Sequence, residues 1–164
     1  MNLWVFSFLL IELIAISFID VRTAKISNLW PLLNLGLVPL VYWIFPSSYQ
    51  WDWGVFLFPL GFIVFGFILF LMGIMGAGDS KFLATLFLLI PLEEQWAFAE
   101  MLLYATMLVG ALLLFRTILK KRSEVKAYLL SHHWKGFFSL IESRFSYAPV
   151  ILIAFVLTGV LRWF

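Results

Sequence analysis

Long apolar runs separated by short polar segments make up most of the chain. A helix of about 20 apolar residues can cross the hydrocarbon core of a bilayer. The first run lacks the basic start and small-residue cleavage site of a signal peptide, so we expect it to remain as a spanning helix. The pattern predicts an all-α integral membrane protein, a single domain over residues 1–164 with six transmembrane helices, at residues 3–19, 29–45, 53–75, 82–92, 97–115 and 147–164.

The fourth run is short for a membrane-spanning helix. At about 1.5 Å per residue, residues 82–92 do not cross a core of about 30 Å. Either the polar residues 79–81 and Glu93-Glu94 belong to the helix, or the bilayer thins around it.

Composition supports a bilayer as the natural solvent. Hydrophobic residues make up 64% of the chain and charged residues 12%, and the mean hydropathy is +1.05. A soluble domain of this size would need more polar surface. The absence of cysteine excludes a disulfide, a thiolate nucleophile and a cysteine-ligated zinc site.

Basic residues gather on one side of the predicted helices. Every lysine and arginine except Arg162 lies in a loop that follows an odd-numbered run, whereas the loops around Asp52 and Glu93-Glu94 have none. Since lysine and arginine mark cytoplasmic loops, we expect both termini outside. The loops at residues 20–28, 76–81 and 116–146 would then face the cytoplasm.

Two aspartates lie at the cytoplasmic ends of predicted helices. Asp79 follows Gly76-Ala77-Gly78, where glycine permits a sharp turn and the close approach of a neighbouring helix or bound peptide. A carboxylate at a helix start is favoured in its charged form. Asp20 closes the first run on the same side. The topology therefore places the two carboxylates at one membrane depth.

Such a pair suits an aspartyl protease. Two carboxylates in a partly dry site do not both ionise easily, so they share a proton. The charged member takes a proton from water, which attacks the peptide carbonyl, and the neutral member donates to the carbonyl oxygen. Helix ends suggest Asp79 as the base and Asp20 as the acid, although Arg22 and Lys25 oppose this assignment.

At these residues the chain resembles the type IV prepilin peptidases, which are GxGD aspartyl proteases of the membrane. The segment from Asp20 to Asn28 is similar to their first motif, an aspartate and basic residues followed by Ile-Pro-Asn, with Ser27 in place of proline. Residues 76–81 match the second motif, Gly-Ala-Gly-Asp-x-Lys, at every fixed position.

A third segment resembles the start of the family's last helix. Tyr147-Ala148-Pro149 is similar to Pro-Tyr-Ala-Pro, with Ser146 in place of the first proline. The resemblance implies that Asp20 and Asp79 are catalytic. We expect further residues to support the active site or shape the substrate groove, namely Gly76, Gly78, Lys81, Asn28, Tyr147 and Pro149.

The resemblance implies cleavage of pilin-like precursors after a glycine, between a basic leader and a hydrophobic helix, at the cytoplasmic face of a bacterial or archaeal plasma membrane. The expected partners are these precursors, the lipid bilayer, and pilus or secretion assembly components, with no nucleic acid. Longer relatives carry a domain with paired cysteines and also methylate the pilin. This chain has no cysteine, so we expect peptidase activity without methylation.

Other functions stay open alternatives. The aspartates could be helix caps, or could bind an ion or relay protons in a noncatalytic assembly factor or transporter. A lipoprotein signal peptidase would place its aspartates on the outer face, against the charge distribution. His132-His133 lie without nearby carboxylates and no helix run contains a histidine. We therefore expect no metal, no cofactor and no serine–histidine mechanism.

Three features outside the aspartate pair have their own interpretations. Glu12 shares a broad helix face with Asp20, and we expect a neutral, hydrogen-bonded structural role for it. Lys81 either acts on the pKa of Asp79 or extends to the interface. Residues 120–144 combine apolar and basic positions at helical spacing, which predicts an amphipathic cytoplasmic segment that anchors to the inner leaflet rather than docks a partner.

Overall fold

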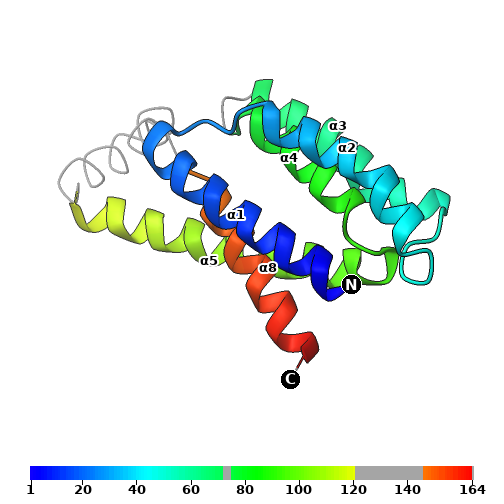
Figure 1. Ribbon diagram of the computed structural model, residues 1–164. Helices are drawn as coiled ribbons and strands as arrows, with labels where there is room; N and C mark the ends of the chain where they lie inside the picture. The colour runs from blue at the N-terminus through cyan, green and yellow to red at the C-terminus, as the bar shows by residue number, and fades with distance from the viewer. Residues whose placement is uncertain (72–74, 121–145, 164) are drawn as a thin grey trace.

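The computed structural model describes residues 1–71, 75–120 and 146–163, and this part of the chain is all-helical (Figure 1). The amphipathic segment predicted for residues 120–144 lies almost entirely outside these ranges. The described elements are α1 (Leu3–Thr23), α2 (Leu29–Ile44), the 3-10 helix η1 (Trp53–Phe56), α3 (Leu57–Leu71), α4 (Ala77–Leu88), α5 (Leu92–Lys120) and α8 (Ala148–Trp163). The predicted all-α fold is thus confirmed for the described residues.

Three helical segments are long and apolar enough to cross a membrane: Leu3–Thr23, Trp53–Leu71 and Leu92–Lys120. Two further apolar helices, α2 and α8, are shorter. These helices support a membrane protein, whereas the six crossings stay a prediction.

The short fourth run belongs to a helix that starts earlier than its apolar residues. Helix α4 has 12 residues and includes Asp79, Ser80 and Lys81 in its first turns. Glu93-Glu94 belong instead to the first turn of α5, where acidic side chains complement the helix dipole.

The described helices form two groups (Figure 1). The α1 group contains α1, α5 and α8, with α8 packed against both α1 and α5. The α4 group contains α2, η1, α3 and α4, with α4 packed against the other three. The chain passes between the groups at residues 24–28 and again at residues 89–91. These two connections lie at opposite ends of the helices.

Helix α1 ends in a way that fixes the position of its last turn. Asn2 caps its start by accepting a hydrogen bond from the Trp4 amide at 2.9 Å. At the other end Ala24 takes the left-handed conformation, with φ 50°, and donates its amide to the Asp20 carbonyl at 2.7 Å. A left-handed residue after the last turn is a common helix stop. Asp20 therefore lies in the final turn of α1.

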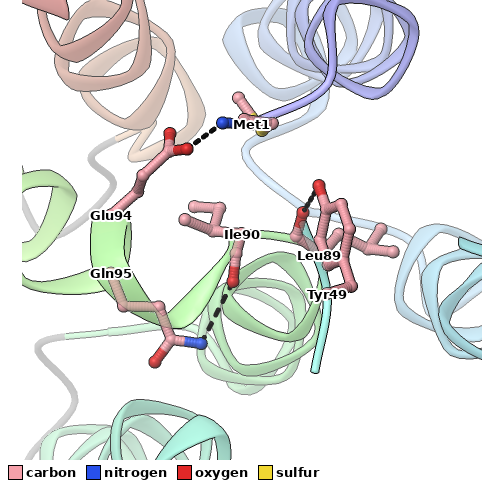
Figure 2. Close-up of polar contacts among 6 residues, drawn as sticks. All are labelled: Met1, Tyr49, Leu89, Ile90, Glu94 and Gln95. Carbon is pink, nitrogen blue, oxygen red and sulfur yellow. Dashed lines mark hydrogen bonds and ion pairs between the residues drawn. The ribbon is translucent and has the colours of Figure 1, made fainter. Parts of the chain in front are cut away.

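Gln95 joins the two groups at the end of α4 (Figure 2). From α5 its amide nitrogen donates to the carbonyls of Phe87 at 2.9 Å, Ile90 at 3.2 Å and Val55 at 3.3 Å. We call these the Gln95 contacts. They link α5 to the last turn of α4, to the connection between α4 and α5, and to η1.

Two further polar contacts lie near the hydrogen bond from Gln95 to Ile90 in Figure 2. The Tyr49 hydroxyl donates to the Leu89 carbonyl at 3.0 Å, and the Met1 amino group pairs with Glu94. Burial raises the pKa of the Tyr49 hydroxyl, so this group stays protonated and remains a donor.

Candidate functional site

Asp20 is buried where α1 meets the start of α8. Its side chain is 2% exposed, and its Oδ2 accepts a hydrogen bond from the Ala148 amide at 3.1 Å. The Ser146 hydroxyl donates to the Asp20 main-chain carbonyl at 3.0 Å. Because Ala148 is the first residue of α8, the carboxylate of Asp20 faces a helix N-terminus.

Asp79 is buried in the first turn of α4. Its side chain is 8% exposed, and its Oδ2 accepts a hydrogen bond from the Gly76 amide at 3.1 Å. A Cβ on Gly76 would lie 2.9 Å from that same oxygen. Gly76 therefore leaves room for the Asp79 carboxylate to reach back to the helix start.

The two aspartates lie at helix ends that pack on common neighbours. The connection that follows Asp20 lies against Gly78, the residue before Asp79, and the Asp20 carboxylate binds the start of α8. The Tyr147 hydroxyl shares a hydrogen bond with the Thr106 hydroxyl of α5 at 2.8 Å. Residues from the end of α1 and the starts of α4 and α8 thus meet at one place, with α5 supporting them.

Gly78 serves close packing rather than an unusual backbone conformation. A Cβ at this position would lie 2.5 Å from the carbonyl oxygen of Ile26, so the connection between α1 and α2 passes directly over the start of α4. None of the described glycines has a positive φ, and Gly76 takes an extended φ of −73°. The close approach predicted for this segment is present, and the approaching group is the chain itself.

The other predicted support residues differ in exposure. Asn28 is the exposed residue before α2, and its side chain makes no capping hydrogen bond. Lys81 is exposed, which favours the interpretation that it extends to the interface. Pro149 is half-buried in the first turn of α8, where proline is well tolerated.

Sequence reasoning missed the backbone groups of the site. The Ala148 amide and the Ile26 carbonyl contact it through main-chain atoms, which carry no residue-specific signal. Thr106 gave only the weak signal of a single hydroxyl within an apolar run. In residues 1–71, 75–120 and 146–163, no cluster of three histidine or acidic side chains could hold a metal ion. His132-His133 lie outside these ranges.

Comparison with known proteins supplies the family. The model of the type IV leader peptidase family matches residues 7–120, which include both Asp20 and Asp79. No curated protein and no solved structure matches the chain at a significant level. The family match covers well over half of the sequence and confirms the resemblance to prepilin peptidases. The chain belongs to the type IV leader peptidase family.

Proposed function

We propose that the protein is a membrane aspartyl endopeptidase that removes the basic leader of type IV pilin-like precursors after a glycine. The observation that carries the proposal is that two buried aspartates, Asp20 and Asp79, flank the place where the connection after α1 packs on the start of α4. Membership of a leader peptidase family supports this activity in general.

In the proposed reaction the aspartate pair activates one water molecule. The charged carboxylate takes a proton from the water, and the resulting oxygen attacks the scissile carbonyl carbon. The neutral carboxyl donates its proton to the carbonyl oxygen. As the tetrahedral intermediate collapses, a proton passes to the departing amide nitrogen, which becomes the new N-terminus of the pilin.

The backbone contacts change the argument about which aspartate is charged. Helix ends alone suggested Asp79 as the base, because it lies at a helix start and Asp20 at a helix end. The Oδ2 atoms of both carboxylates, however, accept a backbone amide at 3.1 Å, one from Gly76 and one from Ala148. Helix ends therefore do not distinguish them, and the proton belongs to the pair.

We further propose that the pair faces the cytoplasm. Arg22, Lys25 and Lys81 lie at the same end of the molecule as the aspartates, and basic residues mark the cytoplasmic side. A pilin precursor would then present its basic leader and cleavage site at this face while its hydrophobic segment stays in the bilayer.

The test is cleavage of pilin precursors by the purified protein in lipid, mapped by mass spectrometry. Asp20→Asn and Asp79→Asn should each lower kcat by at least about 100-fold. Asp52→Asn is the matched control, since Asp52 caps η1 through the Gly54 amide at the other end of the molecule. Cleavage that survives both changes would overturn the mechanism. Failure of the parent protein on a panel of precursors would favour a noncatalytic or ion-handling role.

A further inference from the structure

Two buried polar side chains meet between α1 and α2, away from the aspartates. Glu12 is 3% exposed and Asn34 is 0% exposed. With the amide oriented so that its nitrogen faces the carboxylate, Asn34 donates to the two carboxylate oxygens at 3.1 and 3.2 Å. The hydrogen-bonded role expected for Glu12 thus has a specific partner, Asn34, which the sequence did not indicate.

This contact joins the α1 group to the α4 group partway along the length of α1. Gln95 joins the same groups at the end of α4, and the connection that follows Asp20 packs on the start of α4 beside Asp79. Glu12 precedes Asp20 by eight residues, which is about 12 Å along α1. The Glu12–Asn34 contact therefore lies between the Gln95 contacts and the proposed catalytic pair.

A polar pair is an unusual way to join two apolar helices. Burying a carboxyl and an amide carries a desolvation penalty, and apolar side chains of similar volume often pack with equal or greater stability. What a polar pair adds is register, because its hydrogen bonds form in only one arrangement of the helices. Fixing a register is the best-attested role of such buried groups.

We propose that Glu12 and Asn34 are positioning residues. Their hydrogen bond fixes how the α1 group lies against the α4 group, and so sets the spacing between Asp20 and Asp79. The part of this inference that concerns catalysis rests on the proposed peptidase function.

The chemistry of the pair selects the variants. Glutamine at position 12 can still hydrogen-bond to Asn34, so Glu12→Gln should keep the register. Replacing both residues by leucine removes both polar groups and leaves neither unsatisfied, a change that is often nearly neutral for stability. The double variant, Glu12→Leu with Asn34→Leu, should therefore still fold but lack the hydrogen bond that fixes the register of the helices.

The first measurement reports geometry without requiring activity. Because the chain has no cysteine, nitroxide labels can be attached to Val21→Cys in α1 and Ile68→Cys in α3, both exposed positions. Electron paramagnetic resonance then gives the distance between the groups in lipid nanodiscs. The distribution should be unchanged by Glu12→Gln and should shift or broaden in the double-leucine variant. A label pair inside the α1 group, Val21→Cys with Leu157→Cys, should not change.

The second measurement is precursor cleavage by the same variants without labels. Glu12→Gln should cleave within about twofold of the parent, whereas the double-leucine variant should lose roughly 10- to 100-fold in kcat with little change in KM. Asn34→Ala is the further variant if the double-leucine protein does not fold, with the same expected change in label distance.

The two measurements separate the inference from the proposed function. An unchanged label distance in the double-leucine variant, or in Asn34→Ala, would overturn the inference even if the parent cleaves precursors. A changed distance in a protein that cleaves no precursor would support the positioning role of the pair and would count against the peptidase function alone.

Discussion

At the scale of single residues, the site depends on positions that leave no room for side chains. Gly78 is the clearest case, because the Ile26 carbonyl occupies the space a Cβ would take. Ile26 lies in the connection that follows α1, six residues after Asp20. A side chain at position 78 would therefore displace the connection between α1 and α2, which follows Asp20, at the point where it packs beside Asp79.

Gly78→Ala should lower cleavage roughly tenfold, because small displacements of catalytic groups are costly. It should also destabilise the protein by about 1–3 kcal/mol, the usual effect of inserting a methyl group into a packed site. Cleavage kinetics and thermal unfolding in detergent measure the two effects.

The matched control is Gly61→Ala in α3, where a Cβ would meet nothing within 4 Å. This change should leave cleavage intact and should not destabilise the helix, since alanine is the better helix former. Equal effects of the two substitutions would show that the contact with Ile26 is unimportant.

The sequence indicated the two aspartates but did not indicate several of the groups that contact the site. Asp20 and Asp79 could be singled out because charge is rare in apolar runs and because glycines precede Asp79. The Ala148 amide could not, because every residue except proline has such a donor. Asn34 could not be paired with Glu12, because hydropathy does not set the register between α1 and α2.

At the scale of elements, α5 supports the start of α8. The Thr106 hydroxyl of α5 bonds to the Tyr147 hydroxyl at 2.8 Å, and Tyr147 directly precedes the residue whose amide binds Asp20. This hydrogen bond therefore helps to position the first turn of α8 over the proposed catalytic pair.

Thr106→Val should lower kcat about fivefold, the change expected for losing about 1 kcal/mol of positioning hydrogen bond. Thr117→Val is the control, because the Thr117 hydroxyl donates within α5 to the Leu113 carbonyl. Precursor cleavage by both variants is the measurement. A loss of the same size in Thr117→Val would show that the effect belongs to α5 as a whole and not to its contact with Tyr147.

Helix positions followed from the apolar runs, and the ends of α2 and α8 lie within one residue of their predicted positions, whereas the ends of α4 and α5 do not. The fourth run was expected at residues 82–92, whereas α4 covers Ala77–Leu88. The fifth was expected at residues 97–115, whereas α5 covers Leu92–Lys120. In each case polar residues occupy terminal turns, where water or the helix dipole accommodates them, and a hydropathy pattern does not include them.

At the scale of the whole molecule, the division into two groups was not predictable from the sequence. All the predicted helices are similarly apolar, so the pattern does not say which helix packs against which. The sequence does show a charge difference between the two ends of the predicted helices, because the basic residues gather in the loops at one of them. That difference underlies the proposed orientation, with the loop after α1 inside and the loop after α2 outside.

Two exposed serines test this orientation as a matched pair. Ser27 follows α1 and Ser48 follows α2, and a single cysteine can replace either in this cysteine-free chain. In intact spheroplasts a membrane-impermeant maleimide should label Ser48→Cys and not Ser27→Cys. After permeabilisation it should label both. The reverse pattern would place the aspartates on the outer face and would contradict a cytoplasmic site.

The contact between Asp20 and Ala148 also determines when the proposed site can form during synthesis of the protein. Helix α8 follows every other described helix in the chain, so a ribosome makes both aspartates well before it makes the amide that binds Asp20. The proposed site is therefore incomplete throughout synthesis of α1 to α5. The proposed catalytic pair would be finished only once α8 has been made and has packed against α1.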